Sequence, residues 1–215
     1  EHRFLLVLRG EDLNGEIEDT DPQEIGKPPL AAQPTSDKGR KMAHLVDEFS
    51  AKAGEILRDD HPANMVVLRG FAKRPGWPTM EEAFGIRSAA VAGYPMYRGL
   101  AKLLGMDELE TGNTVEDEIK TLGNSWYDYD FFYVHVKGTD SAGEDGDFDR
   151  KVSVIEDVDK NIPKLMDLNP DVVMVTGDHS TPSVMEFHSW HPVPTLLWSD
   201  CCRADTAESF GERAC

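Results

Sequence analysis

Two polar motifs, each directly after a short apolar run, constrain the fold and the chemistry of this chain most strongly. The first motif begins at Thr139 after the apolar run 131–136, and the second begins at Gly177 after the run 172–175. Short runs of β-branched and other apolar residues are typical of buried parallel strands. Their separation fits one strand–helix–strand unit, and ligands bind beyond the carboxyl ends of such strands. We therefore expect both motifs to meet at one edge of an α/β sheet.

The two motifs carry residue types that bind divalent metal ions. Asp140 and Glu144 belong to the first motif. Asp178 and His179 belong to the second, and His188 follows nine residues after His179. Carboxylate oxygens together with imidazole nitrogens suit Mn, Zn or Fe ions. Each residue alone also has an ordinary explanation, because Asp is common in turns and an acidic loop can simply be solvated.

The apolar periodicity of the whole chain predicts alternating strands and helices. We expect strands at 4–8, 65–68, 88–92, 130–136, 171–176 and 193–198, and helices at 41–58, 96–104, 115–122 and 152–165. Residues 10–40 are polar and rich in Gly and Pro, which predicts a long loop. The alternation indicates an α/β fold with a mostly parallel sheet. A Pro/Gly cluster at 69–78 is the expected domain boundary, and it divides the chain into 1–76 and 77–215.

Charge and cysteine usage exclude several classes of partner. With 40 acidic and 22 basic residues the net charge is −18, which disfavours nucleic acids and anionic membranes because both attract basic surfaces. No apolar stretch approaches the roughly 20 residues of a membrane span. Three cysteines without a C-x-x-C spacing indicate neither a disulfide framework nor a thiolate site, and favour a reducing, cytoplasmic compartment. Glycine-rich nucleotide-binding motifs are also missing from the sequence.

A small basic group interrupts this acidic chain. Arg69, Lys73 and Arg74 lie in the Pro/Gly cluster. A guanidinium group binds phosphate or carboxylate through two parallel hydrogen bonds. A salt-bridged surface explains the same residues equally well, so the sequence leaves both interpretations open.

Three segments taken together resemble one known family. The segment 172–194 contains Asp-His and then His-Ser-x-x-Pro-Val-Pro, 139–144 contains Thr-Asp-x-x-Gly-Glu, and 78–94 leads from Pro-Thr-Met to Ala-Gly-Tyr. The set is similar to the metal-binding motifs of the cofactor-independent phosphoglycerate mutases, in particular the archaeal-type branch, within the alkaline phosphatase superfamily. The resemblance runs from about residue 4 to the end of the chain.

The resemblance implies two divalent metal ions, with Mn²⁺ expected and Mg²⁺, Co²⁺ or Zn²⁺ as alternatives. By the resemblance, Asp140 and His188 bind one ion, and Asp178 and His179 bind the other. Glu144 stands where many members of the family have His. A carboxylate can replace an imidazole on a hard ion such as Mn²⁺, so we expect Glu144 to point into the same site.

The resemblance also implies a reaction and a substrate. It predicts interconversion of 3-phosphoglycerate and 2-phosphoglycerate, a small phosphorylated acid, through a phosphoserine intermediate. Residues 1–76 would be the remaining part of an inserted cap domain, in which Arg69 binds substrate with Arg74 as its companion. Residues 77–215 would be the later part of a phosphatase-like core. The family's serine nucleophile and one further Asp ligand precede the cap domain, so we expect a piece of a longer polypeptide that is inactive by itself.

Two other interpretations of the sequence stay open. Another phosphotransferase or hydrolase of the same superfamily could use the same metal frame, because fold and metal site do not fix the substrate. A catalytically silent binding module would account for the missing nucleophile.

Overall fold

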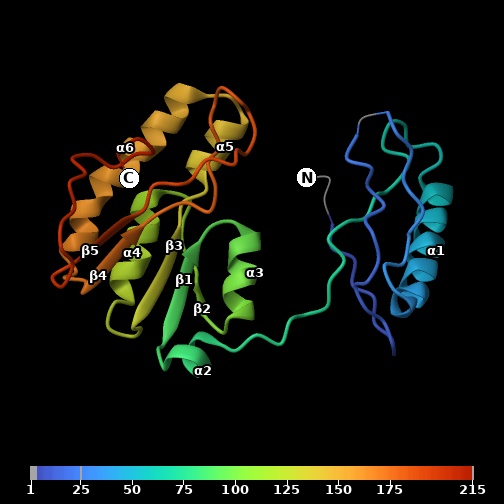
Figure 1. Cartoon of the computed structure of the whole chain (residues 1–215), viewed down its shortest axis with the longest axis horizontal. Coiled ribbons are helices and arrows are strands. Elements are labelled where there is room, and N and C mark those ends of the chain that lie inside the picture. The colour runs from blue at the N-terminus through green and yellow to red at the C-terminus, as the bar shows by residue number, and fades with distance from the viewer. Residues whose placement is uncertain (1–3, 25, 215) are drawn as a thin grey trace. The chain divides into compact units, whose positions relative to one another are not determined.

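The chain divides into two units at the Pro/Gly-rich segment, with Glu1–Gly76 as the first unit and Trp77–Cys215 as the second. The computed structural model describes residues 4–24 and 26–214. Each unit has its own cluster of buried apolar side chains. The first unit runs from blue to teal in Figure 1, and the second from green to red. Within the described ranges, no helix is long and apolar enough to cross a membrane.

The first unit consists of one long helix packed against an irregular chain. Helix α1 (Arg40–Ile56) follows a 3-10 turn, η1 (Asp37–Gly39), and confirms the helix expected at 41–58. The segment before it has little regular structure, as the sequence predicts for 10–40. The core of the unit nevertheless draws on this loop as well as on α1, and consists of Ile17, Ala32, Ala43, Val46 and Leu68.

Two strands expected in the first unit are not formed in its described part. The run 4–8 has no partner strand, and Leu5 is 87% exposed. At 65–68, the backbone of Leu68 pairs with a single residue. Its N–H donates to the Thr20 hydroxyl at 2.8 Å, and its carbonyl accepts from the Thr20 N–H at 2.8 Å. Both strand predictions are therefore wrong, because an apolar run becomes a strand only where another chain segment offers a ladder of bonds.

The second unit is built on a parallel sheet with the order β2-β1-β3. The central strand β1 (Ser88–Ala92) pairs with β2 (Asp107–Leu109) and with β3 (Phe131–His135). Every residue of β1 is buried, as expected for a strand that is covered on both faces. The α/β fold and the strands expected at 88–92 and 130–136 are confirmed.

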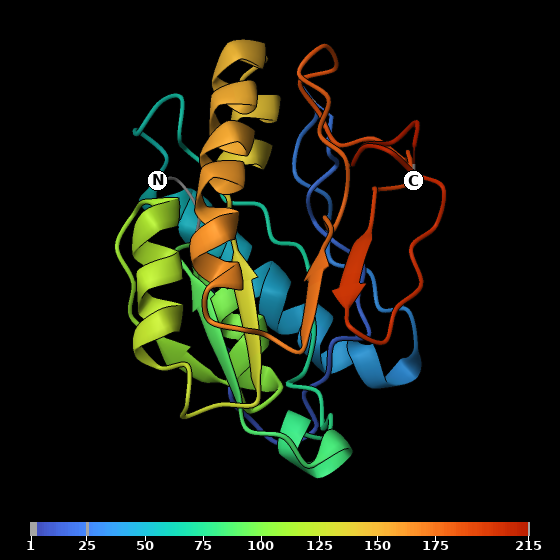
Figure 2. The same ribbon diagram turned by 90° about the vertical axis from the view of Figure 1, so that its left-hand side faces the viewer.

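Helices cover both faces of this sheet. Helix α3 (Pro95–Leu103) packs on one face, and α4 (Val115–Asn124) lies with α6 (Phe148–Met166) on the other (Figures 1 and 2). Local sequence signals set their ends. Gly105, with φ 72°, follows α3, and Thr114 begins α4 in a capping box, because its side chain satisfies a free N–H of the first turn. The three helices expected in this unit are confirmed.

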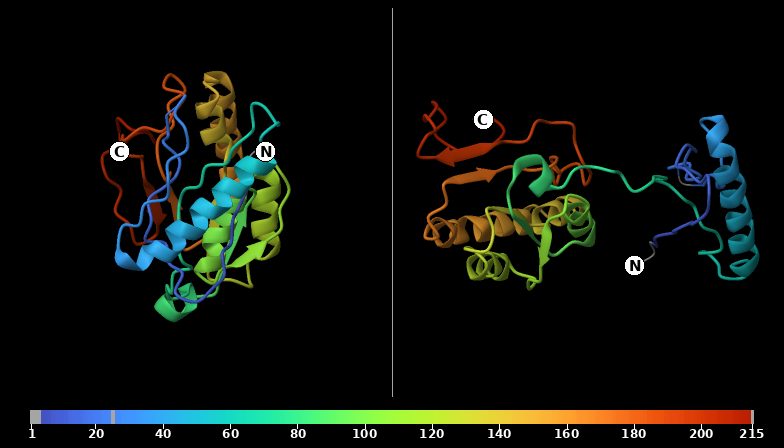
Figure 3. Two further views of the ribbon diagram at one scale, coloured as in Figure 1. Left: turned by 90° about the vertical axis from the view of Figure 1, so that its right-hand side faces the viewer. Right: turned by 90° about the horizontal axis from the view of Figure 1, so that it is seen from below.

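The last two strands form a separate sheet. Strand β4 (Val172–Val175) pairs antiparallel with β5 (Leu196–Ser199), as the opposed arrows in the right panel of Figure 3 show. Both strands were expected from the sequence, but within a mostly parallel sheet. No helix separates them, and a parallel partner requires a crossover connection that is usually helical. A chain that returns through a loop pairs antiparallel instead.

Three short elements were not expected from the sequence. Helix α2 (Met80–Phe84) and strand β2 are only 5 and 3 residues long. Helix α5 (Gly138–Glu144) contains the first polar motif, which has the composition of a turn. Because α5 begins directly after β3 and is followed by α6, the motif is displayed on a helix at the carboxyl end of a strand.

Candidate metal centre

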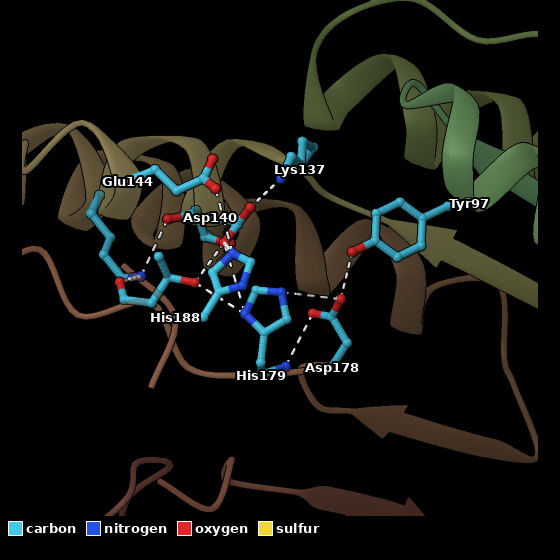
Figure 4. A network of polar contacts seen from close by, with 10 residues as sticks. Tyr97, Lys137, Asp140, Glu144, Asp178, His179 and His188 are labelled. Atoms are coloured by element: carbon cyan, nitrogen blue, oxygen red, sulfur yellow. Dashed lines mark hydrogen bonds and ion pairs between the residues drawn. The ribbon is translucent and has the colours of Figure 1, made fainter. Parts of the chain in front are cut away.

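The first motif contributes two carboxylates from the same side of a helix. Asp140 and Glu144 are four residues apart in α5, a spacing that puts their side chains on one face. His188 lies against both: its Nε2 is 3.5 Å from Asp140 Oδ1 and 3.4 Å from Glu144 Oε1. Figure 4 shows these three side chains converging. The structure thus brings the first motif and His188 together.

The second motif reaches the same point from the loop after β4. His179 Nε2 is 3.5 Å from Asp178 Oδ2, and His179 Nδ1 is 3.9 Å from Asp140 Oδ1. The rings of His179 and His188 are 3.8 Å apart, centre to centre. One ligand atom each from Asp140, His179 and His188 lies within 4.8 Å of the others. All five residues that the sequence nominates as metal ligands therefore belong to one cluster.

A backbone bridge explains why the two histidines meet. Ser180 and Ser189 form an isolated antiparallel bridge, in which the Ser189 N–H donates to the Ser180 carbonyl at 2.9 Å. His179 and His188 directly precede these serines, so the bridge places them beside each other. The second histidine of this loop, His191, lies with its Nδ1 2.9 Å from the Ser189 hydroxyl. Of the two histidines in this loop, His188 is the one that joins the cluster.

The donor set matches the chemistry of a divalent cation. Three carboxylates and two imidazoles offer oxygen and nitrogen ligands, which suit Mn²⁺ or Zn²⁺ better than a soft ion. Two ligands that bind one ion at about 2.1 Å each lie roughly 3.0–3.4 Å apart. The N–O distances of 3.4 and 3.5 Å around His188 and His179 approach that spacing. The residues present therefore fit a metal ion.

Comparison with known proteins identifies the family. A family model described as the metalloenzyme superfamily matches residues 29–214. The chain belongs to the metalloenzyme superfamily.

Curated relatives of this chain include proteins named as probable phosphoglycerate mutases. A "Probable 2,3-bisphosphoglycerate-independent phosphoglycerate mutase" of Thermotoga maritima is 50% identical, and one of Aquifex aeolicus is 49% identical; both matches cover 100% of this chain and 54% of the relative. The chain thus spans about half the length of the curated relatives it matches. Among solved structures, the cofactor-independent phosphoglycerate mutase of Thermoplasma acidophilum aligns with a TM-score of 0.62 at 28% identity, over 96% of this chain and 55% of that one. A Pyrococcus horikoshii protein aligns with a TM-score of 0.72 at 29% identity, over 83% and 54%.

Hydrogen bonds keep the two aspartates of this cluster ionised. Burial by itself would raise the pKa of Asp140, but hydrogen bonds from Lys137 and Thr181 outweigh it and hold that pKa below its ordinary value. The pKa of Asp178 is likewise lowered, because the Tyr97 hydroxyl, 2.5 Å from Asp178 Oδ2, more than compensates for burial. Both carboxylates are therefore anionic at neutral pH and available to a cation.

Sequence reasoning missed three residues that support the ligands, namely Tyr97, Lys137 and Thr181. Tyr97 comes from α3, and its ring stacks on His135 at 3.5 Å. Lys137 pairs with Asp140, and Thr181 bonds to Asp140 from the second motif. Lys137 and Thr181 could have been suspected from their positions beside the motifs. Tyr97 carries no such signal, because it lies 81 residues from Asp178 in the sequence.

The two arginines predicted to bind substrate lie in the first unit. Arg69 forms an ion pair of 3.7 Å with Asp21, and Arg74 is exposed. Lys73 from the same basic group lines a cavity of about 550 Å³ in that unit, together with Asp12, Asn14, Asp37, Lys38, Arg40 and Lys41. Arg69 and Arg74 are not among the residues that line this cavity, and their role in binding substrate stays a prediction.

Proposed function

We propose that this chain supplies the metal-binding residues of a phosphoglycerate mutase, which interconverts 3-phosphoglycerate and 2-phosphoglycerate through a phosphoserine intermediate. The observation that carries the proposal is the convergence of Asp140, Glu144, Asp178, His179 and His188 in one cluster. Relatives that match the full chain carry the name of that enzyme. The proposed reaction belongs to glycolysis and gluconeogenesis. A cytoplasmic location is proposed with it, because the exposed free thiols of Cys201 and Cys202 are compatible with a reducing compartment.

The cluster is proposed to hold two divalent ions, with Mn²⁺ as the first choice. Asp140 and His188 bind one ion, with Glu144 replacing a nitrogen ligand, and Asp178 and His179 bind the other. Carboxylates favour hard ions such as Mn²⁺ and Mg²⁺, and imidazole favours Zn²⁺ and Co²⁺. A bound ion of this kind neutralises the charge on a transferring phosphoryl group. The residues that bind the ion would set its position, and therefore the place where the charge of the phosphoryl group is neutralised.

The first unit is proposed to be part of a cap domain that holds the glycerate. Arg69 and Arg74 carry guanidinium groups suited to a carboxylate or a phosphate. Arg69 is only loosely paired, at 3.7 Å from Asp21, so an anionic substrate can compete for it. Holding the glycerate while its phosphoryl group is carried on the serine lets the phosphate return to the other hydroxyl, and shielding it from water limits hydrolysis.

An activity assay on two polypeptides tests the proposal. The chain spans 54% of the relative from Thermotoga maritima. The serines inside the two motifs, Ser141 and Ser180, lie among the proposed metal ligands, so we place the nucleophile in the remaining half. Conversion of 3-phosphoglycerate, coupled to enolase with Mn²⁺ present, is expected for a polypeptide that includes that half and not for the 215 residues alone, because losing a nucleophile removes many orders of magnitude of rate. Comparable turnover by the 215-residue chain would mean that the nucleophile lies within it. Turnover of other phosphate esters but not of phosphoglycerates would favour another phosphotransferase.

A further inference from the structure

Thr181 lies between two proposed ligands that come from different motifs. Its side chain is buried, with 4% exposed, and its hydroxyl oxygen is 2.5 Å from Asp140 Oδ1 and 3.1 Å from His179 Nδ1. We propose that Thr181 is a positioning residue that selects the tautomer of His179 and orients Asp140. The inference rests on the metal site proposed above, and it adds a residue that is not itself a ligand.

The number of hydrogens that Thr181 can donate decides the direction of both contacts. A threonine hydroxyl has one hydrogen to donate, and an ionised carboxylate can only accept. At 2.5 Å from Asp140 Oδ1, the hydroxyl of Thr181 gives that hydrogen to the carboxylate. Towards His179 the same oxygen can only accept, so the hydrogen in the 3.1 Å contact belongs to Nδ1. The lone pair of His179 is then on Nε2.

This tautomer is the one that the geometry of the site needs. His179 Nε2 faces Asp178 Oδ2 at 3.5 Å, with which it is proposed to share an ion. A histidine ligand generally donates its second ring N–H to a neighbouring oxygen, which fixes the ring and makes the other nitrogen a better ligand. Figure 4 shows the chain of contacts from Asp140 to Asp178 through His179. The Thr181 hydroxyl thus orients both His179 of the second motif and the Asp140 carboxylate of the first.

The surroundings of Thr181 hold its hydroxyl in place. Lys151 of α6 donates to the Thr181 carbonyl at 2.8 Å and to the Thr139 carbonyl at 3.2 Å, and so ties the two motifs together. On the side of the methyl group, Gly143 of α5 approaches so closely that a Cβ there would lie 2.9 Å from Thr181 Cγ2 and would also collide with the Thr181 carbonyl. Lys151 thus anchors the backbone of Thr181, and Gly143 packs closely against its methyl group.

Thr181→Val and Thr181→Ser separate hydrogen bonding from packing. Valine keeps the shape and removes the hydroxyl, whereas serine keeps the hydroxyl and loses the methyl group. We expect Thr181→Val to weaken Mn²⁺ binding about 10- to 100-fold, the usual effect of losing a partner that orients a ligand, and Thr181→Ser to stay within about 3-fold of the unaltered chain. Thr176→Val is the matched control, because it removes a hydroxyl that bonds Thr195 at 3.0 Å in the same segment, and it should bind normally.

Calorimetric Mn²⁺ titrations of these variants, with circular dichroism to verify folding, test the inference. Equal affinity of Thr181→Val and the unaltered chain would overturn it. If the unaltered chain bound no Mn²⁺, or bound it equally well after Asp140→Asn, the proposed metal site would be wrong instead.

A second measurement is independent of metal and of the valine variant. Long-range ¹⁵N–¹H correlation spectra of the metal-free chain report which nitrogen of a neutral histidine carries the hydrogen. We expect Nδ1–H for His179 in the unaltered chain and in Thr181→Ser. A signal from Nε2–H in the unaltered chain would refute the tautomer assignment, whatever the affinities show.

Discussion

Glu118 makes the stability of the second unit depend on pH, in a direction that the structure specifies. The side chain lies in α4 with 7% exposed, and its Oε2 is buried without a hydrogen-bond partner. Burial, helped by the negative charge of Asp117, raises the pKa of Glu118 from an ordinary 4.5 to about 7. Burial of an unpaired carboxylate favours its neutral form.

The direction of the pH dependence follows from whether the folded or the unfolded chain loses the Glu118 proton first. Below pH 4.5 both the folded and the unfolded chain keep the proton, and Glu118 carries no electrostatic penalty. Between pH 4.5 and 7 the unfolded chain ionises first, so stability falls as the pH rises; above pH 7 the loss is constant. The difference between a pKa of about 7 and one of 4.5 corresponds to roughly 3 kcal/mol of unfolding free energy if the whole pKa shift acts on stability. We expect a loss of about 2–3 kcal/mol.

Glu118→Gln should remove this pH dependence. The free energy of unfolding of the variant, minus that of the parent, should rise by about 2–3 kcal/mol between pH 4 and pH 8. Urea titrations in the presence of a chelator, followed by tryptophan fluorescence, measure it, because all four tryptophans lie in the second unit. Glu116→Gln is the control in the same helix: Lys164, 2.7 Å away, lowers the pKa of this exposed carboxyl, so its smaller difference should run the other way. A Glu118→Gln difference that stays flat across this pH range would refute the reasoning.

Two further predictions concern the metal ligands and a helix cap. Glu144→Ala should weaken Mn²⁺ binding at least about 10-fold in calorimetric titrations, and Glu144→His should largely restore it. The control Asp145→Ala removes a carboxylate paired with Arg150 and should leave the affinity unchanged. Unchanged affinity in Glu144→Ala would exclude a ligand role. Thr114→Ala removes the cap of α4 and should lower the free energy of unfolding by about 1 kcal/mol in urea titrations, with Thr114→Ser close to the parent. A Thr114→Ala variant as stable as the parent would show that tertiary packing alone fixes the start of the helix.

The elements that could be predicted from the sequence are those with local causes. The capping box at Thr114 and the positive φ of Gly105 fix helix ends through bonds and sterics within a few residues. Strand β2 was missed because Asp107 and its acidic neighbour do not look like a strand; they become one only by pairing with β1. For the apolar run 4–8 the prediction fails in the opposite way. Its composition favours a strand, but no described segment pairs with it. Helix α5 contains glycines and a serine, which are weak helix formers, so its helicity also depends on context.

The same distinction separates the candidate ligands from the residues that support them. Asp140 and His179 could be nominated because a carboxylate or an imidazole after an apolar run has a recognisable chemical meaning. Tyr97 and Thr181 could not, because what matters is which atom each one meets across 81 and 41 residues of sequence. A tyrosine or a threonine has many ordinary uses in a protein interior, and only the folded chain shows which carboxylate its hydroxyl reaches.

These supporting contacts also join parts of the second unit that lie on different sheets. Tyr97 links α3, which packs on the parallel sheet, to Asp178 in the loop that follows β4. Lys151 links α6 to Thr181 in that loop, and Thr181 returns to Asp140 on α5. The bonds that orient the candidate ligands therefore also connect the loop after β4 to α3, α5 and α6. Because a cation shared by Asp140 and the loop residues would strengthen the same connection, metal binding should stabilise the junction between the two sheets more than either sheet alone.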